Sequence, residues 1–589
     1  MGDEGPEPRE AGAGTAATGE IRAAAARIGP YEPDCDVMGA GTNIDWRRER
    51  TVEKVRRDFL KIAGTGVAAM VTSGASSAWA GPIPGKASHA DEGAPVQQGA
   101  SFLNVKATGA TGDGKTIDTP AINHAIESLA STGGGTVYFP AGEYLCHSIR
   151  LKSNVGLFLD QGAVIVAADA PPEGQAGGYD DPEPAQPWEA YQDYGHNHWH
   201  NSLIWGEDLH DVSIGGPGRI WGRGLMRNYD PTGRNAAESR TQGVGNKAIS
   251  LKNCHNVQLR DFQILQGGWF GILATGVDNL LIDGLTIDTN RDGMDIDCCR
   301  NVRIANCAVN SPWDDGIVPK SSYALGYARA TENVEITNCY VTGAWQLGTM
   351  LDGTWKRFAP ESRVPHTGRI KFGTESNGGF RNITISNCVF EGCRGLALET
   401  VDGALLEDVS ITNITMREIV SAPIFLRLGA RLRGPEESTK PGRLARVRIS
   451  NVVCSNANSR FGCIVSGIPG HAIEDLTLHD IYIQHQGGGT REQAAITPEE
   501  DEQKYPEPNM FGPMPSQGFY LRHVKNVSLS EIEIAAMAED ARPAFVLQDV
   551  SGAELFHIKT PANAPVLELH DSADVKTLWV RGVPDGPQG

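Results

Sequence analysis

The feature that most constrains the fold of this chain is an internal repeat, in which an asparagine precedes a short run of alternating apolar residues. Successive copies begin at Asn256, Asn279 and Asn301, so they are 23 and 22 residues apart. The copies are Asn256-Val257, Asn279-Leu280, Asn301-Val302, Asn333-Val334, Asn382-Ile383 and Asn526-Val527. A period near 22 with short strands and turns is typical of a parallel β-helix, whose coils bury their apolar faces only by stacking on their neighbours. A β-sandwich needs no such regular period, so the sequence predicts an all-β fold, a parallel β-helix solenoid.

The repeat also suggests where the folded domain begins and ends. We expect the β-helix to span residues 101–570 and a C-terminal tail to occupy 571–589. Residues 119–126 have the pattern of an N-terminal capping helix, with Pro120 near its start, which is a favoured position for proline. Such a helix covers strand ends that otherwise invite aggregation. The aromatic-rich stretch 171–200 is predicted to be a long loop, which either forms a groove wall or packs on the flank of the solenoid.

The N-terminal region carries an export signal rather than part of the fold. Arg56-Arg57 precedes a weakly apolar, uncharged stretch that ends in the cleavage pattern Ala78-Trp79-Ala80. Residues 56–80 therefore resemble a twin-arginine signal; a transmembrane helix is the alternative, but bilayer spans are usually more apolar. We expect 1–55 to be a disordered extension and 81–100 a linker. The predicted partner is the twin-arginine translocation machinery, and the predicted location is periplasmic or secreted, with no stable membrane span.

Charge and cysteine content narrow the partners further. The chain has 52 Lys and Arg against 72 Asp and Glu, a formal net charge of −20. This balance disfavours nucleic acid or an anionic membrane as the main partner, because both bind to basic faces. The 11 cysteines include no CxxC pair and mostly stand singly in strand-like segments, so we interpret them as small buried hydrophobic residues. We expect the protein to be a monomer.

Five carboxylates lie within 24 residues, in Asp292-Gly293-Met294-Asp295-Ile296-Asp297 and Asp314-Asp315. Asp292 lies 13 residues after Asn279, and Asp314 lies 13 residues after Asn301, so the repeat places them in neighbouring coils. Neighbouring coils stack at about 4.8 Å, the spacing between strands. The same offset of 13 residues, counted from Asn256 and Asn333, gives Trp269 in the coil before and Gln346 in the coil after. The repeat therefore predicts a column of side chains on one face: Trp269, Asp292, Asp314 and Gln346.

Clustered carboxylates beside an aromatic ring favour the hydrolysis of glycosidic bonds. One protonated carboxyl must give a proton to the leaving oxygen, and one ionised carboxylate must activate water or attack the anomeric carbon. Acids held close together cannot all ionise, so one keeps its proton near neutral pH; the ring can stack on a sugar face. Two alternatives for Asp292, Asp314 and Asp315 are a Ca²⁺ site and turn capping at solenoid corners. We expect Asp295 and Asp297 to support the site rather than to react.

The repeat, Asn290-Arg291-Asp292-Gly293 and the Asp314-Asp315 pair resemble glycoside hydrolase family 28, the polygalacturonases and rhamnogalacturonan hydrolases, over roughly residues 101–550. The resemblance implies a right-handed parallel β-helix, no cofactor or metal, and single-displacement hydrolysis with inversion. It makes Asp314 the general acid, with Asp292 and Asp315 holding the nucleophilic water. Arg291 stands where the family has a threonine.

The sequence departs from the family pattern at two motifs. Where the family has Gly-His-Gly, this chain has Trp345-Gln346-Leu347-Gly348, and His366 is the candidate to replace the missing histidine. The family's Arg-Ile-Lys motif, which binds the substrate carboxylate in polygalacturonases, matches either Arg369-Ile370-Lys371 or, by local pattern, the strand that holds Glu399. In the second case Glu399 disfavours an anionic galacturonate and favours a neutral sugar. The predicted substrate-binding residues are Asn290, Arg291, Gln346, Trp269, Trp345, His366, Arg369, Lys371 and Glu399.

The sequence therefore predicts an exported inverting glycoside hydrolase that acts on pectic polysaccharide or its oligomers, either galacturonan or rhamnogalacturonan. One alternative is a β-helical polysaccharide lyase, which would use a Ca²⁺-bound uronate and a base such as Lys320 or Lys371. A second alternative is a non-catalytic solenoid that binds glycans. The acids in neighbouring coils favour hydrolysis.

Overall fold

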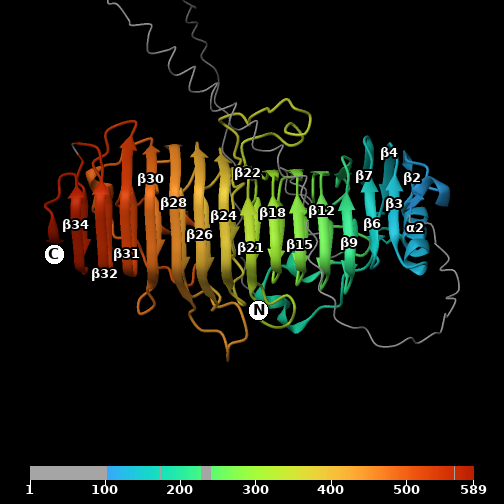
Figure 1. Cartoon of the computed structure of the whole chain (residues 1–589), viewed down its shortest axis with the longest axis horizontal. Helices are drawn as coiled ribbons and strands as arrows, with labels where there is room; N and C mark the ends of the chain where they lie inside the picture. The colour runs from blue at the N-terminus through green and yellow to red at the C-terminus, as the bar shows by residue number, and fades with distance from the viewer. Residues whose placement is uncertain (1–101, 173, 227–240, 563, 589) are drawn as a thin grey trace, which may run out of the picture. The chain divides into compact units, whose positions relative to one another are not determined.

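The computed structural model describes residues 102–172, 174–226, 241–562 and 564–588. These residues form a solenoid of stacked strands, which Figure 1 shows from α2 (Thr119–Ser131) at one end to β34 (Ala573–Val580) at the other. The predicted N-terminal extension (1–55), export signal (56–80) and linker (81–100) lie outside the described residues.

One face of the solenoid, which we call the front sheet, carries the acidic motifs. Its six strands pair in the order β20, β17, β14, β11, β8 and β5, and every pairing is parallel. Their bounds are β5 (Ile149–Arg150), β8 (Ile204–Glu207), β11 (Lys247–Lys252), β14 (Phe270–Thr275), β17 (Asp292–Asp297) and β20 (Ile317–Lys320). A bridge from Ile317 to Ile370 continues this face into β23 (Lys371–Phe372), β25 (Leu396–Thr400), β27 (Ile424–Leu428) and β29 (Cys463–Ser466).

Two further rows of parallel strands complete each coil. The first row is β1 (Phe102–Asn104), β3 (Gly135–Phe139), β6 (Val155–Leu159), β9 (His210–Gly215), β12 (His255–Arg260), β15 (Asp278–Asp283), β18 (Arg300–Ala305) and β21 (Thr331–Thr337). The second is β2 (Asp113–Ile117), β4 (Gly142–Cys146), β7 (Ala163–Ala167), β10 (Arg219–Trp221), β13 (Gln263–Leu265), β16 (Thr286–Asp288), β19 (Ala308–Asn310) and β22 (Tyr340–Thr342).

The two rows merge in the C-terminal half, where β24 pairs with both β21 and β22. The long strands are β24 (Phe380–Glu391), β26 (Leu405–Arg417), β28 (Arg443–Ala457), β30 (Ile473–His485), β31 (Phe519–Ala536) and β32 (Phe545–Ile558), followed by the shorter β33 (Leu567–His570). The remaining short elements are η1 (Val105–Thr108), η2 (Pro187–Tyr191), η3 (Tyr194–Asn197), α3 (Arg491–Ala494) and η5 (Pro508–Phe511).

The repeated asparagines form a ladder of side-chain amides at one corner of the coils. Each has a positive φ of 55° to 57°, a conformation that asparagine tolerates better than other non-glycine residues. In four of them the side-chain Nδ2 donates to Oδ1 of the preceding asparagine: Asn279 to Asn256 (2.9 Å), Asn301 to Asn279 (3.2 Å), Asn333 to Asn301 (3.1 Å) and Asn382 to Asn333 (2.8 Å). The repeat therefore marks the turns that set the register of the solenoid.

The interior is a continuous stack of apolar side chains. Ile272, Met294 and Ile317 occupy the same register position in three successive coils, and all three are fully buried. The ten cysteines that the structure describes are free and buried, as the sequence predicts. Each coil thus buries its apolar face against its neighbours, which is where a solenoid obtains its stability.

Both ends of the solenoid are covered. At the N-terminal end, α2 turns Ile122, Ile126 and Leu129 into the core, which confirms the predicted capping helix. At the other end the predicted tail 571–589 is wrong, because β34 pairs in parallel with β32 and β35 (Gly586–Gln588) pairs antiparallel with β34. β34 buries Val575 and Val580 against the core, so this segment adds a further coil to the solenoid.

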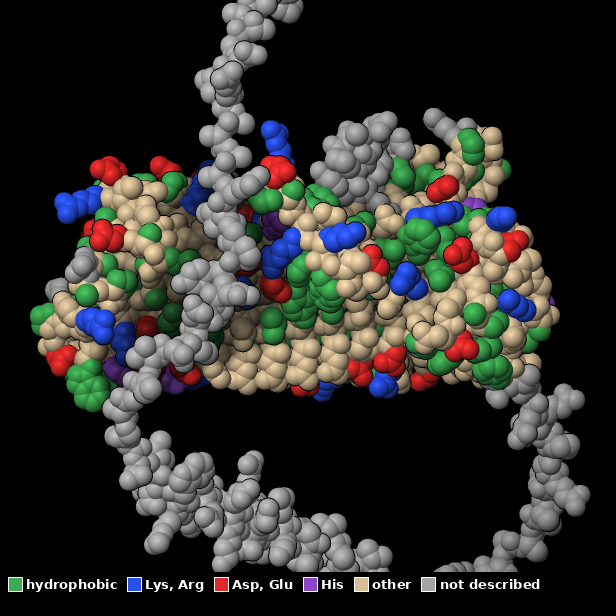
Figure 2. Space-filling view, turned by 90° about the horizontal axis from the view of Figure 1, so that it is seen from above, with side chains coloured by type: hydrophobic (Ala, Val, Ile, Leu, Met, Phe, Trp, Pro, Cys, Tyr) green, Lys and Arg blue, Asp and Glu red, His purple; other side chains and the backbone are tan. Residues whose placement is uncertain are grey.

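The outer surface mixes both signs of charge. On the face seen in Figure 2, Lys and Arg side chains are interspersed with Asp and Glu. This face therefore lacks the large field of one sign that steers polyions. Among the helices that the structure describes, none is both long enough and apolar enough to cross a bilayer.

The asparagine ladder makes a prediction about stability. Asn301→Ala should lower the free energy of unfolding by about 1–3 kcal/mol. Alanine is strained at a positive φ, and two ladder hydrogen bonds are lost. Asn301→Gly removes the same hydrogen bonds without the backbone strain, so its loss should be smaller. Urea unfolding of both variants measures the difference, and equal losses would contradict a role for the positive φ.

Candidate active site

The register of the front sheet brings Asp292 and Asp315 side by side. Met294 pairs with Ile317, which sets Asp315 opposite Asp292 in the next coil. The offset between β17 and β20 is 23 residues, whereas β15 and β18 of the same coils pair at an offset of 22. One residue is therefore added at the corner, and Asp315 takes the place that the repeat predicts for Asp314.

Three carboxylates meet at this point. Asp292, Asp314 and Asp315 each contribute an oxygen, and these oxygens lie within 4.8 Å of one another. Asp292 and Asp315 are each only 4% exposed, whereas the side chain of Asp314 is 26% exposed. The predicted acidic cluster is thus assembled, with two members buried and one open to solvent.

Asp315 is held in its ionised form by two buried cations. Arg369 Nε donates to one carboxylate oxygen at 2.8 Å, and Lys371 Nζ lies 3.3 Å from the other. Burial alone would raise the pKa of Asp315, but the charges of Arg369 and Lys371 outweigh it and hold this pKa well below the usual value.

Asp292 has the opposite electrostatic environment. Its burial raises its pKa well above the usual value, and the charges of Asp314 and Asp295 raise it further against the weaker pull of Lys320 and Arg291. Asp314 has a direct cationic partner, because Arg291 Nη2 lies 2.8 Å from its Oδ2. The surroundings of Asp292 therefore favour its protonated form, while a cation pairs with each of the other two acids.

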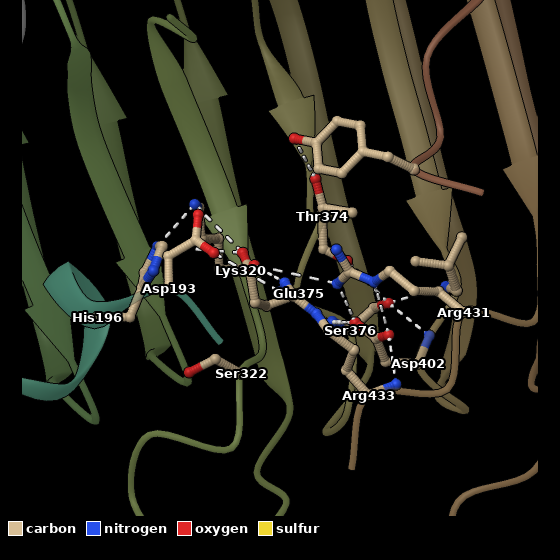
Figure 3. Close-up of polar contacts among 12 residues, drawn as sticks. Asp193, His196, Lys320, Ser322, Thr374, Glu375, Ser376, Asp402, Arg431 and Arg433 are labelled. Carbon is tan, nitrogen blue, oxygen red and sulfur yellow. Dashed lines mark hydrogen bonds and ion pairs between the residues drawn. The ribbon is translucent and has the colours of Figure 1, made fainter. Parts of the chain in front are cut away.

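A second group of charged side chains, shown in Figure 3, surrounds Lys320 at the end of β20, the strand that follows Asp315. Lys320 Nζ lies 3.1 Å from an oxygen of Asp295 and 3.4 Å from one of Glu375, and it is 2.8 Å from His196 Nε2. Burial lowers the pKa of Lys320, but Asp295 and Glu375 outweigh it and raise this pKa well above the usual value. Lys320 is therefore a fixed positive charge beneath η3.

Arginines from the loop after β27 complete this group (Figure 3). Arg433 binds Glu375 at 2.6 Å and lies 3.6 Å from Asp193, the residue before η3. Arg431 Nε donates to Asp402 at 3.0 Å. Segments far apart in the chain therefore meet over the front sheet beside the three acids.

A further segment, from the loop before β31, reaches the site although the sequence analysis did not identify it. Glu507 accepts a hydrogen bond from Arg369 and lies 3.0 Å from Arg394 Nη1. The hydroxyl of Tyr505 lies 3.2 Å from Lys371 Nζ and 2.8 Å from Thr374 Oγ1. The only sequence signal for this segment is the Tyr505-Pro506-Glu507-Pro508 pattern. This pattern does not indicate which distant residues the segment contacts.

The predicted column is wrong at both ends. Phe270, not Trp269, pairs with Asp292, and Trp269 is 7% exposed in an apolar cluster with Trp199 and Phe270. A sugar ring therefore cannot stack on Trp269. Gln346 lies in the insertion 343–368, where its Nε2 donates to a backbone carbonyl at 3.0 Å. Counting from the repeat does not place Gln346 on the front sheet, because the insertion separates β22 from β23.

The same cluster settles the two alternatives for the stretch 171–200 in favour of packing at its C-terminal end. Trp199 is buried on the front sheet, and its indole N–H donates to Thr275 at 3.1 Å. Trp188 donates to the carbonyl of Ala324 at 3.1 Å, so it too packs on the solenoid.

Two other predicted binding residues belong to the insertion. Trp345 donates to the hydroxyl of Tyr340 at 3.0 Å and lies under Arg357. His366 Nδ1 donates to the carbonyl of Gly343 at 2.8 Å. These contacts hold both side chains within the insertion and its base, and none of them reaches the three acids. Asn290 is buried at the bend before β17, where its carbonyl accepts a hydrogen bond from Trp313.

Both matches to the Arg-Ile-Lys motif lie near Asp315. The coil of Arg369 and Lys371 directly follows that of Asp315, and Glu399 lies on β25 in the next coil. Glu399 is fully buried with an oxygen 3.7 Å from Lys371 Nζ, and burial raises its pKa to about 8 against the charges of Lys371 and Arg369. Glu399 is thus largely neutral at pH 7, and the literal motif is the one beside the acids.

Among the residues that the structure describes, two groups of side chains have a spacing that suits a cation. One is Asp292, Asp314 and Asp315 themselves. The other is Glu183, His200 and Glu207. In the second group Lys252 Nζ lies 2.7 Å from Glu207, and the amides of Trp199 and His200 bind Glu183, so the protein already supplies its partners.

Comparisons with known proteins agree with this architecture. Residues 102–188 match the family model described as rhamnogalacturonase A/epimerase, pectate lyase-like, and residues 229–354 match the right-handed β-helix region. The chain is a right-handed parallel β-helix. A probable polygalacturonase of Vitis vinifera is 26% identical over 324 residues, which is 52% of this chain and 59% of that protein.

Two solved structures share the fold. The exopolygalacturonase of Thermotoga maritima has a TM-score of 0.50 at 18% identity, over 66% of this chain and 88% of that one. The family 28 exopolygalacturonase of Yersinia enterocolitica has a TM-score of 0.52 at 17% identity, over 83% of this chain and 79% of that one. At these identities the likeness concerns the fold.

The unlike environments of Asp292 and Asp315 predict opposite effects on stability. Folding favours the protonated form of Asp292, so this residue costs stability above its unfolded pKa. Asp292→Asn should therefore raise the free energy of unfolding at pH 7 by about 1–3 kcal/mol, and the gain should shrink as the pH falls toward 4. Asp315→Asn removes one charged partner from each of two buried cations and should lower the free energy of unfolding by about 3–5 kcal/mol.

Urea unfolding at pH 7 and pH 4 checks both variants, and each serves as the control for the other. A loss of stability in Asp292→Asn at pH 7, equal to that of Asp315→Asn, would contradict the division of charge within the cluster.

Proposed function

We propose that this chain is a glycoside hydrolase that cleaves pectic polysaccharide or its oligomers. The observation that carries the proposal is the cluster of three carboxylates with unlike environments, in which Asp292 favours a proton and Asp315 favours a charge. Glycosidic hydrolysis needs this combination of acid and base. The match to a rhamnogalacturonase-like model and the similarity to a probable polygalacturonase support pectin as the substrate class.

In the proposed reaction Asp314 is the general acid, because its side chain is the exposed member of the cluster. Sugar binding displaces Arg291 from Asp314, and the proton of Asp292 passes to it. Asp314 then protonates the leaving glycosidic oxygen while water attacks the anomeric carbon. The proton of that water goes to the pair Asp292 and Asp315. Because the water attacks from the face opposite the leaving group in a single displacement, the first product has inverted configuration.

The structure favours hydrolysis over the lyase alternative. A lyase base must be able to lose its proton, but Lys320 and Lys371 are buried among carboxylates that raise both pKa values well above the usual value. Neither lysine is therefore suited to take a proton near neutral pH. The cations that already pair with Asp314 and Asp315 also disfavour a Ca²⁺ ion at the cluster.

The proposal includes export and a site of action. Residues 56–80 have the pattern of a twin-arginine signal, and a polysaccharide substrate lies outside the cytoplasm. We propose that the folded chain is exported by the twin-arginine machinery and acts as a monomer in the periplasm or outside the cell.

Hydrolysis predicts a specific pattern of products. The wild-type protein should release reducing sugar from polygalacturonate, rhamnogalacturonan or their oligomers without any unsaturated product. Asp314→Asn should reduce this rate at least about 100-fold, since it removes the proton donor. Asp408→Asn is the matched control, because Asp408 is an exposed aspartate that also pairs with an arginine.

Any other outcome of this assay would indicate a different function. An unsaturated product absorbing in the ultraviolet would mean a lyase, and binding without products would mean a glycan-binding solenoid. Proton NMR of the first product tests the mechanism: the oxygens of the cluster lie within 4.8 Å, closer than the carboxyl separation of about 6.5–9.5 Å in most inverting enzymes. A retained configuration would therefore make one of the acids a nucleophile.

A further inference from the structure

Three cations of the site converge on a carboxylate that the protein itself supplies. Glu507 accepts a hydrogen bond from Arg369, lies 3.0 Å from Arg394 Nη1 and lies 3.9 Å from Lys371 Nζ. Burial alone would raise the pKa of Glu507, but Arg369, Arg394 and Lys371 outweigh it and lower this pKa. Glu507 is therefore a fixed negative charge that three cations surround, next to Asp315.

These cations have little room for a second carboxylate. Arg369 is 1% exposed and Lys371 is 2% exposed, so a bound sugar cannot reach either side chain. The hydroxyl of Tyr505 lies against Lys371 and Thr374, and its ring lies 5.1 Å from Lys371 Nζ. Arg369 and Lys371 thus act beneath the surface, where they hold Asp315 and Glu507, and they do not serve as the predicted binding residues.

The segment that carries Glu507 is anchored on both sides. Arg522 donates to the carbonyls of residues 498 and 499, and Arg427 donates to those of residues 500 and 501. Phe511 is buried in an apolar cluster, with both of these arginines stacked on its ring. Pro506 and Pro508 flank Glu507 and restrict its backbone further. These contacts hold the segment in place, so it forms one wall of the site.

An anionic sugar at this wall would have to displace Glu507 from its three partners. The displaced carboxylate would then stay partly buried without a cation, which is unfavourable. An uncharged sugar ring has no such conflict, because its hydroxyl groups can donate to Glu507 and its apolar face can stack on an aromatic ring. The residue that offers such a ring here is Tyr505, which is exposed at its outer side.

We propose that the sugar subsite beside Asp315 binds an uncharged sugar ring, with Glu507 in the place of a substrate carboxylate and Tyr505 as the stacking platform. The inference rests on the proposed function, of which it defines the substrate class at this subsite. It selects the neutral residues of pectic chains, or uronates whose charge has been removed.

Paired oligosaccharides that differ only in charge test the inference. Tetramers of polygalacturonate and of rhamnogalacturonan are each compared with their carboxyl-reduced forms, in which every carboxylate is a hydroxymethyl group. Calorimetry measures binding to the Asp314→Asn protein, which prevents turnover. We expect the reduced form of at least one tetramer to bind at least ten-fold more tightly than its acid form.

The variant Glu507→Gln, in the same background, should strengthen binding of the acid form at least ten-fold and change binding of the reduced form less than three-fold. Glu499→Gln is the matched control, because it makes the same change on an exposed residue of the same segment. It should leave both affinities unchanged. If Glu507→Gln does not fold, the comparison of the paired tetramers still decides.

The inference is overturned if the acid forms bind as tightly as the reduced forms, if Glu507→Gln leaves the preference unchanged, or if no tetramer binds. Hydrolysis by the protein with Asp314 intact is measured separately. Binding of the reduced form without hydrolysis of any substrate would keep this inference and defeat the proposed function. Efficient hydrolysis of the acid form of the polygalacturonate tetramer, in which every residue is charged, would keep the proposed function and defeat this inference.

Discussion

The hydrogen bonds that join each coil to the next in fixed register position the acids of the site and the buried cations beside them. Because Met294 pairs with Ile317, Asp292 and Asp315 come to lie in adjacent coils at the strand spacing. The bridge from Ile317 to Ile370 then places Arg369 beside Asp315. Residues tens of positions apart in the chain therefore become neighbours without any local sequence signal, and the asparagine ladder stabilises the corners that keep this register.

Charge balance explains why such a crowded site can exist. Asp315, Glu507 and Asp314 each lie against at least one cation, while Asp292 and Glu399 lie where burial favours their protonated forms. The protein thus divides its acids into charged and neutral members, and this division supplies the donor and the acceptor that hydrolysis needs. The same division pairs the buried cations Arg369 and Lys371 with carboxylates of the protein itself.

The sequence was sufficient for the fold and for the three acids, but not for their surroundings. The asparagine period predicted the β-helix because each asparagine is a physical corner with its own hydrogen bonds. Counting from these corners failed at Gln346, since the insertion 343–368 interrupts the period, and at Trp269, since the register is one residue different. Glu507 could not be found because its partners lie more than a hundred residues earlier in the chain.

The protonation state of Asp292 tests the central claim most directly, because it requires no knowledge of the substrate. Carbon-13 NMR of protein labelled at the aspartate carboxyl carbons, compared with Asp292→Asn, assigns the signal of this residue. The account predicts that Asp292 is still protonated at pH 7, because burial and its acidic neighbours raise its pKa, while Asp315 is ionised. Titration of Asp292 below pH 5, like an ordinary aspartate, would contradict it.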